Sequence, residues 1–228
     1  REEADGFSLR SHQKAVAAIE AGRFKDEIVA VEVKNRKGVT VVDTDESPRA
    51  DTSVEALGRL RPAFVRDAPD DIDVHVVTAG NAPGLNDGAA AIMVASLEYA
   101  EANGLAIDAI ISGYATGATE PQDLFFAPIA AVNNLMAKEN KAIRDYDLVE
   151  VNEAFAVQAI ADMNALGMDE ARVNVNGGAV ALGHPIGASG TRILITLLNA
   201  MDQQSAGTGL ATLCLGGGNA VALSVEKA

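Results

Sequence analysis

Three side chains that could transfer a proton or help to stabilise an oxyanion stand in or beside predicted loops of this sequence. The first is Cys214, which ends an apolar segment and is followed closely by Gly216, Gly217 and Gly218. A free cysteine in such a segment is commonly just a small buried apolar side chain. The three glycines favour a chemical role instead, because they expose backbone N–H groups that can hold an oxyanion.

The other two side chains are a histidine and an asparagine. His184 lies in a glycine-rich stretch, residues 176–190, directly before an apolar segment. Glycine lets the backbone approach a ligand closely, and histidine titrates near neutral pH, although a single histidine can equally be structural. Asn152 and Glu153 stand where a predicted strand turns into a helix. Asn152 could therefore face a ligand at the helix N-terminus, or it could simply cap the helix.

A fourth loop, residues 77–88, is dense in the turn-forming residues glycine, asparagine, proline and threonine. It could border a binding site, or it could be a linker between domains. Metal-ligand spacing, a P-loop and a dinucleotide-binding glycine pattern are all absent from the sequence. We therefore expect no metal site.

Periodicity and breaker residues predict the elements that must position these loops. The predicted helices are residues 8–21, 97–103, 129–139, 153–166 and 188–201. The predicted strands are residues 28–33, 39–42, 89–95, 109–114, 148–151, 173–175, 210–215 and 220–225, with a turn at 35–38. Strands that alternate with helices indicate a layered α/β domain that ends in an antiparallel pair.

Composition excludes several classes of protein. With 18 Lys+Arg against 32 Asp+Glu, the net charge is −14, which argues against nucleic acid as a partner. Hydrophobic residues at 48% exclude a disordered chain. The apolar runs fall short of the roughly 20 residues of a membrane helix, so we expect no membrane partner. The single cysteine fits a reducing cytoplasm.

In this order and spacing, the blocks at 77–88, 152–156, 176–190 and 214–218 resemble the thiolase family, across essentially the whole chain. The resemblance implies a thiolase-like α/β fold whose C-terminal domain is a layered βαβαβαββ unit with helices on both faces. It also implies acyl transfer between an enzyme cysteine and coenzyme A, with coenzyme A as substrate and no separate cofactor. The reverse direction would be a Claisen condensation of two acetyl-CoA molecules.

The resemblance assigns a catalytic role to four residues. His184 would activate the nucleophilic cysteine and contribute to an oxyanion hole, and Asn152 would hold a water that completes this hole. Cys214 would be the acid/base, and the Gly216 N–H would bind the second oxyanion. A thiol suits the base role only if neighbours lower its pKa, which His184 could do. Forming an enolate needs such a base near the carbon and charge stabilisation at the oxygen.

Family pattern also implies the contacts of coenzyme A. Arg49 would approach the nucleotide, while Phe64 and Phe155 would lie against the pantetheine. Pro83 stands where many members have a serine that contacts the pantetheine amide, so this contact is in doubt. Residues 67–76 are longer than the family pattern and are interpreted as a surface insertion.

The largest departure from the family is the missing nucleophile. Cys214 is the only cysteine and belongs to the acid/base motif. We expect residues 1–83 to end the loop domain, 84–105 to be the last strand and helix of the N-terminal domain, and 106–228 to form the C-terminal domain. The strand and helix would then leave an unpaired edge and an uncovered apolar face. The chain opens on Arg1 and looks like the interior of a longer polypeptide.

Three hypotheses follow from this departure. In the first, which we favour, the chain is the C-terminal part of an active thiolase, and this chain alone is inactive because it lacks the N-terminal half. Members of the family are commonly oligomers, so we expect an oligomer. In the second, it is a non-catalytic thiolase-like subunit that binds coenzyme A or a partner enzyme. The third, an acyltransferase related to ketoacyl synthases, fits poorly, because those usually carry two histidines instead of a His/Cys pair.

Overall fold

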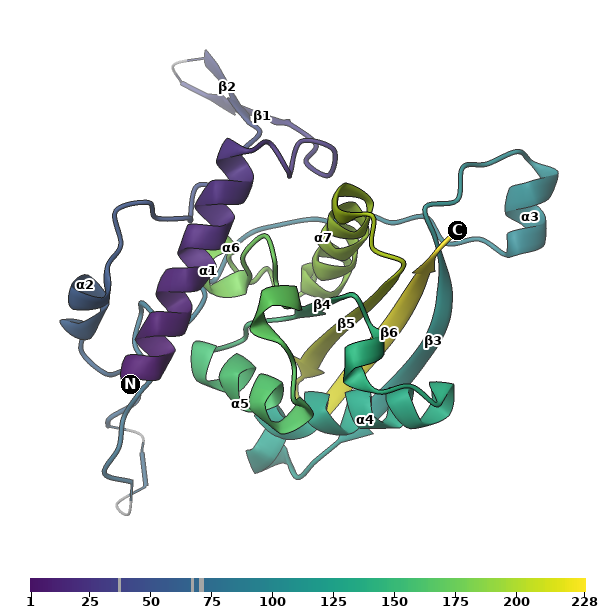
Figure 1. Ribbon diagram of the computed structural model, residues 1–228. Helices are drawn as coiled ribbons and strands as arrows, with labels where there is room; N and C mark the ends of the chain where they lie inside the picture. Colours follow the sequence, from purple (N-terminus) through teal and green to yellow (C-terminus); the bar gives the residue numbers. More distant parts are fainter. Residues whose placement is uncertain (37, 67, 70–71) are drawn as a thin grey trace.

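A computed structural model of the chain describes residues 1–36, 38–66, 68–69 and 72–228. Lys37 of the expected turn, and residues 67, 70 and 71 of the expected insertion, lie outside the described residues. The described fold is mixed α/β, as the sequence predicts. A layered domain follows α3 in the chain, and the long helix α1 (Glu2–Glu20) packs against its side (Figure 1).

The layered domain is built on a four-stranded sheet with the order β3-β6-β5-β4. Its strands are β3 (Ala109–Ala118), β4 (Leu148–Val151), β5 (Thr208–Leu215) and β6 (Asn219–Lys227). β6 pairs antiparallel with both β3 and β5, whereas β5 pairs parallel with β4. The parallel pair requires crossover connections, and helices supply them.

Helices cover both faces of this sheet, which confirms that expectation (Figure 1). On one face, α4 (Ala127–Glu139) and α5 (Ala156–Leu166) bury a core that includes Leu135 and Leu210. On the other face, α7 (Ser189–Gln204) buries a second core around Ile193 and Leu197. Along β5, alternate residues enter the two cores, because successive side chains of a strand point to opposite faces.

The predicted strand at 173–175 is wrong. Val173 forms only an isolated bridge with Val149, and η3 (Glu170–Arg172) precedes it. The Asn174 side chain then takes the place of a strand, because its Oδ1 accepts from the Val151 N–H and its Nδ2 donates to the Val151 carbonyl, both at 2.8 Å. A side chain thus satisfies the edge of β4 that a strand would have paired.

Two predicted helices begin elsewhere. α1 begins at Glu2 and not at Ser8, whose hydroxyl bonds back to the Ala4 carbonyl at 2.8 Å instead of capping a helix. α5 begins at Ala156 with Phe155 as N-cap, so Asn152 is not the cap. The Gln158 side chain accepts from the Ala154 N–H at 3.0 Å and so takes part of the capping role.

Smaller elements complete the described part of the chain. The hairpin of β1 (Val31–Asn35) and β2 (Gly38–Val42) projects from the end of α1, and its described residues are exposed (Figure 1). The helices α2 (Val54–Gly58) and α3 (Leu97–Ala102) each begin at a serine N-cap. The short helix α6 (Ala179–Leu182) contacts α1.

The predicted strand at 89–95 is also wrong, since these residues are extended but unpaired. Their apolar side chains face outward: Met93 is 85% exposed and Val94 is 68% exposed. A strand requires a partner for its N–H and C=O groups, and the described residues offer none here. The expected uncovered apolar surface is therefore present, although without a strand beneath it.

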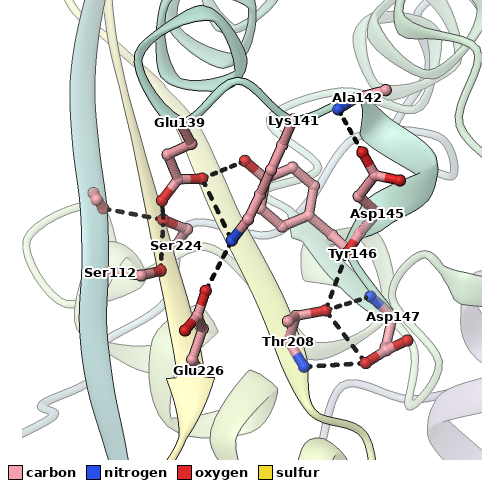
Figure 2. A network of polar contacts seen from close by, with 11 residues as sticks. Ser112, Glu139, Lys141, Ala142, Asp145, Tyr146, Asp147, Thr208, Ser224 and Glu226 are labelled. Carbon is pink, nitrogen blue, oxygen red and sulfur yellow. Dashed lines mark hydrogen bonds and ion pairs between the residues drawn. The ribbon is translucent and has the colours of Figure 1, made fainter.

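A polar network closes the end of the sheet where α4 leads into β4 (Figure 2). Glu139 accepts hydrogen bonds from the Tyr146 and Ser224 hydroxyls, and Lys141 forms an ion pair with Glu226 at 2.7 Å. Asp147 accepts from the Thr208 N–H at 2.9 Å. These bonds join α4, β4, β5 and β6 and leave the opposite ends of β4 and β5 free for other groups.

No helix in the described ranges has the length and apolar character to cross a membrane.

Candidate active site

Two of the candidate loops leave the sheet at the same edge. Asn152 directly follows β4, and Gly216 directly follows β5. Because β4 and β5 are parallel, their carboxyl ends lie side by side, and the Asn152 N–H donates to the Thr212 carbonyl at 3.0 Å. This bond places Asn152 two residues from Cys214 along the neighbouring strand.

His184 joins this edge through Asn152. The Asn152 Nδ2 lies 3.4 Å from His184 Nε2, and His184 Nδ1 lies 2.6 Å from the Ser189 hydroxyl. Ser189 donates its own hydrogen to the Pro185 carbonyl at 3.1 Å, so its oxygen is left to accept from His184 Nδ1–H. The imidazole therefore carries its proton on Nδ1 and presents the Nε2 lone pair beside Asn152.

Electrostatics keep this imidazole neutral. His184 is half-buried, and this burial, followed by the positive charge of Arg192, lowers its pKa below the usual value. A neutral imidazole can take a proton from a thiol at Nε2, which in this structure accepts from the Asn152 Nδ2–H at 3.4 Å.

The side-chain oxygen of Asn152 is buried and unpartnered within the described part of the chain. The residue is fully buried, yet its Oδ1 has no hydrogen-bond partner among the described residues. A buried amide oxygen without a partner costs about 1–3 kcal/mol, so such an atom indicates a place for a donor from outside the chain.

Cys214 is half-buried near the end of β5. By strand alternation it shares a face with Leu210, on the side of α5. Burial, and next the charge of Asp162, raise the pKa of the Cys214 thiol, so the expectation that His184 lowers it is wrong for this structure. The described contacts include no hydrogen bond between the thiol and His184.

Gly216 opens the turn between β5 and β6 and is exposed. A Cβ added there would meet open space, so the backbone is accessible to a ligand. Gly218 has the opposite constraint, because its φ is +87° and a Cβ there would lie 2.5 Å from the Thr119 carbonyl oxygen, so the position requires glycine. The backbone of the turn is therefore closely packed at Gly218 and accessible at Gly216.

Glu153 holds the Asn152 loop in place through hydrogen bonds of its buried carboxylate. Its carboxylate accepts from the Ser11 hydroxyl, the Asn174 amide and the Val180 N–H, each at 2.9 Å. A Cβ at Gly178 would approach the Glu153 Cδ to 2.1 Å, so only glycine allows this contact. Burial raises the pKa of Glu153, and the three hydrogen bonds oppose that rise. Its role is to fix the loop, not to meet a substrate.

Residues 77–88 are the hub of the site and not a linker. The Asn81 side-chain amide donates to the carboxylate of Asp5 in α1 at 2.9 Å. The Asn81 backbone carbonyl accepts from the Ala156 N–H at the start of α5. The Gly84 carbonyl accepts from the His184 N–H at 3.3 Å. This loop therefore contacts α1, the Asn152 loop and the His184 loop together.

The residues expected to contact coenzyme A lie around this hub. Pro83 is half-buried beside Gly84, and Phe155 packs edge-on against Phe125 with ring centroids 5.2 Å apart. Arg49 has an exposed side chain, while its N–H donates to His12 Nδ1 at 3.1 Å. Phe64 is 62% exposed with a φ of +61°, and no described ring packs against it. Their roles stay predictions.

Sequence reasoning missed two residues. Ser189 fixes the tautomer of His184, and Asn86 contacts the His184 N–H through its Oδ1 at 3.3 Å. The signal for Ser189 was a hydroxyl five residues after His184, at the start of a helix. Asn86 stood among turn-forming residues, where asparagine is common for local reasons, and so carried no signal.

The fold and this edge of the sheet define an α/β protein with a histidine, an asparagine and a cysteine motif at the carboxyl ends of parallel strands. Family models agree: "Thiolase, N-terminal domain" matches residues 1–98, and "Thiolase, C-terminal domain" matches residues 105–227. The chain belongs to the thiolase family.

Relatives in sequence and structure are thiolases as well. The chain is 51% identical over 228 residues to an acetyl-CoA acetyltransferase of Pseudomonas aeruginosa, covering 100% of this chain and 56% of that protein. The crystal structure of human mitochondrial 3-ketoacyl-CoA thiolase matches with a TM-score of 0.94 at 38% identity, again with 100% and 56% covered. The Bacillus anthracis acetyl-CoA acetyltransferase structure has the same TM-score at 43% identity and the same coverage. The chain thus spans about 56% of the length of these relatives.

Proposed function

We propose that this chain forms the acid/base part of a thiolase active site, which transfers acyl groups between coenzyme A thioesters. In thiolysis, an enzyme cysteine attacks the 3-keto carbon of a 3-ketoacyl-CoA. The C2–C3 bond breaks, and the acetyl-CoA enolate leaves. Coenzyme A then attacks the acyl-enzyme and carries the acyl group away. The observation that carries this proposal is the pairing of Asn152 with a neutral, oriented His184.

His184 would take the proton of the nucleophilic thiol at Nε2. Its geometry supports this role, because Ser189 holds the other ring nitrogen and Nε2 keeps its lone pair. Once protonated, the Nε2–H becomes a donor toward an enolate oxygen. A water bound by the unpartnered Asn152 Oδ1 would supply the second donor, with its other hydrogen directed at the same oxygen.

Cys214 would give a proton to the enolate carbon and later take one from the coenzyme A thiol. A thiol with a raised pKa rests in the neutral form, which is the form that donates. The enolate is a strong base, so a thiol is acidic enough to protonate it. The exposed Gly216 N–H would stabilise the oxyanion that forms when the acyl-enzyme is attacked.

Coenzyme A would approach along the hub. Arg49 would meet its nucleotide, and Phe64, Phe155 and Pro83 would border the pantetheine. A crystal structure of human mitochondrial 3-ketoacyl-CoA thiolase in complex with CoA, with a TM-score of 0.92, supports binding of this ligand to the same fold. The net charge of the chain is −14, so the positive charge of Arg49 would offset the repulsion between the protein and the anionic nucleotide.

We further propose that the nucleophile comes from a polypeptide segment outside these 228 residues. The only cysteine is Cys214, and it stands in the acid/base motif. The same segment would cover the exposed apolar residues near Met93. A non-catalytic subunit is not favoured, because binding alone would not need an oriented base beside an unpartnered amide oxygen. The predicted domain boundaries, the oligomer and the cytoplasmic location stay predictions.

Two half-reactions of the full-length gene product test these roles. Cys214→Ser should still form the acetyl-enzyme from acetyl-CoA, whereas condensation should slow by about 10²–10⁴-fold, because a hydroxyl is a poor acid/base near pH 7. The acetyl-enzyme is measured by mass spectrometry and condensation by the absorbance of acetoacetyl-CoA. Equal loss of both half-reactions would show that Cys214 is structural.

A matched control is Ser205→Ala. Ser205 is the C-cap of α7, its side chain is exposed, and the described hydrogen bonds join it to none of the candidate residues. This variant should keep both half-reactions within about twofold of the unmodified protein.

A further inference from the structure

Asn86 is the only side chain among the described residues that bonds both the His184 backbone and the loop that carries Arg49. Its Oδ1 accepts from the His184 N–H at 3.3 Å, and its Nδ2 donates to the Ser47 hydroxyl at 3.4 Å. Ser47 and His184 are 137 positions apart in the chain (184 − 47), so this amide joins two distant segments.

Glycines flank the half-buried Asn86 side chain where two loop backbones approach each other. Gly183 has a φ of +99°, and a Cβ there would lie 2.3 Å from the Asn86 Oδ1. A Cβ at Gly84 would lie 2.9 Å from the same oxygen, and one at Gly88 would lie 2.8 Å from Pro185. The two backbones therefore approach through glycines on both sides, and the Asn86 side chain fills the space between them.

The Ser47 side of this contact has a second anchor. Two residues after Ser47, the Arg49 N–H donates to His12 Nδ1 at 3.1 Å. His12 is buried on α1, and this burial, followed by the charge of Arg49, lowers its pKa, so the ring stays neutral and can accept. The loop at 47–49 is thus held to α1 by His12 and to the active site by Asn86.

We propose that Asn86 is a positioning residue that couples the coenzyme-binding loop at Ser47–Arg49 to the backbone of His184. This inference rests on the proposed function. Coenzyme A bound at Arg49 fixes the position of the Ser47 hydroxyl. The Asn86 amide, which bonds to this hydroxyl and to the His184 N–H, then restricts the motion of the turn that carries His184. Because one planar amide makes both bonds, the two cannot be adjusted independently. Asn86 touches neither substrate nor reacting atoms and acts through His184.

A double-mutant cycle in the full-length gene product tests the coupling. Asn86→Ala removes both bonds and should raise KM for coenzyme A and lower kcat for thiolysis, each by about three- to tenfold. Ser47→Ala removes only one bond and should raise KM similarly while lowering kcat less. The variant with both substitutions should have the KM of Asn86→Ala alone, because the Ser47 bond is already lost.

Asn134→Ala is the matched control. The Asn134 side chain donates to the Thr116 carbonyl at 2.9 Å on the outside of α4, so the substitution also removes one asparagine bond. It should leave KM and kcat within about twofold of the unmodified protein. Thermal unfolding of all variants separates misfolding from a loss of coupling, and Ser47→Ala provides the KM comparison even if Asn86→Ala unfolds.

Each outcome decides the matter. Non-additive KM values, with a larger kcat loss in the Asn86 variants than in Ser47→Ala, support the coupling. The coupling is wrong if the KM increases of the two single variants multiply in the double variant, or if Asn86→Ala leaves kcat unchanged. In either case the unmodified enzyme still turns over, so the proposed function stands. If Ser47→Ala leaves KM unchanged, the coupling is likewise wrong. A full-length protein that neither binds coenzyme A nor thiolyses acetoacetyl-CoA refutes the proposed function, and this inference falls with it.

Discussion

The layered domain and the segment at 85–98 are both rich in apolar side chains, but only the first has them covered. Leu135 and Leu210 are 0% exposed between the sheet and its helices, whereas Leu85 is 92% exposed and Met93 is 85% exposed. Burial of such a side chain contributes about 1.5–3 kcal/mol, which the exposed segment forgoes. Large exposed apolar surfaces mark sites of interaction, so residues 85–98 are a candidate interaction surface, whereas the core of the layered domain is closed.

The same contrast holds for polar groups. In the layered domain, the network of Figure 2 ties Glu139, Tyr146 and Ser224 into one hydrogen-bonded unit. In the hairpin of β1 and β2, the Asn35 amide donates to the Thr40 hydroxyl at 3.2 Å, and this bond lies on the exposed surface. A two-stranded hairpin alone is marginally stable. The hairpin therefore contributes little stability of its own, whereas the layered domain shares its core with Ala4 and Phe7 of α1.

The sharpest way to break this comparison is to truncate one side chain in each region. Leu135→Ala should lower the free energy of unfolding by about 3 kcal/mol, because it leaves a cavity in a closed core. Met93→Ala should change the stability of the isolated chain by less than about 0.5 kcal/mol. Urea unfolding of both variants measures these effects.

Repeating the pair in the full-length protein extends the test. If another segment covers Met93 there, Met93→Ala should become destabilising, by about 1–2 kcal/mol. An equal and negligible effect of Met93→Ala in both proteins would contradict the assignment of this surface to a covering partner.

A second test concerns the glycine that admits Glu153. Gly178→Ala should lower the free energy of unfolding by about 1–3 kcal/mol, because the added methyl meets the carboxylate carbon at 2.1 Å and a buried acid cannot move aside. Gly58→Ala is the matched control, since a Cβ at Gly58 meets nothing within 4 Å. Similar melting temperatures for the two variants would mean that the Asn152 loop is not held as described.

The smallest effect is a pH dependence that comes from one buried acid. Burial raises the pKa of Asp162 from 3.8 to about 7, and the Gln158 amide that donates to it opposes the rise. The folded protein keeps a proton that the unfolded chain releases above its lower pKa, so this group's stabilisation is lost as pH rises toward 7. Asp162→Asn should reduce the loss of unfolding free energy between pH 5 and 7 by on the order of 1–2 kcal/mol.

The exposed Asp108 offers the control for this prediction. Asp108→Asn should leave the pH dependence of unfolding unchanged, because an exposed carboxylate contributes little to stability. A pH dependence that is the same in Asp162→Asn and in the unmodified chain would show that Asp162 ionises as freely in the folded state as in the unfolded one.

The sequence predicted the elements whose partners lie within the chain. The helices α3, α4 and α7 and the strands β4, β5 and β6 were found because their periodicity, and end signals such as Gly104, are local. The strand at 89–95 was wrong because a strand depends on neighbours that periodicity does not reveal. The strand at 173–175 was wrong because the side chain of Asn174 replaces main-chain pairing, which no local pattern announces.

The candidate site shows the same division. The motifs led us to expect His184 and Asn152 at one site, and the structure brings Asn152 Nδ2 within 3.4 Å of His184 Nε2. The pKa of Cys214 was wrong in direction, since it depends on burial and on Asp162, which comes from a different element. Ser189 and Asn86 were missed because their roles arise from distances between segments and not from residue type.

The central claim is that His184 and Cys214 perform acid/base work, with Asn152 completing the oxyanion hole, for a nucleophile outside these 228 residues. Thiolysis of acetoacetyl-CoA should be measured for this chain alone, for a thiolase N-terminal segment that carries the proposed nucleophilic cysteine alone, and for the two mixed. The chain alone should show no turnover and no acetyl-enzyme, because a covalent intermediate needs a second thiolate. The mixture should recover activity. Turnover by the isolated chain that Cys214→Ala abolishes would contradict the claim, because Cys214 would then be the nucleophile.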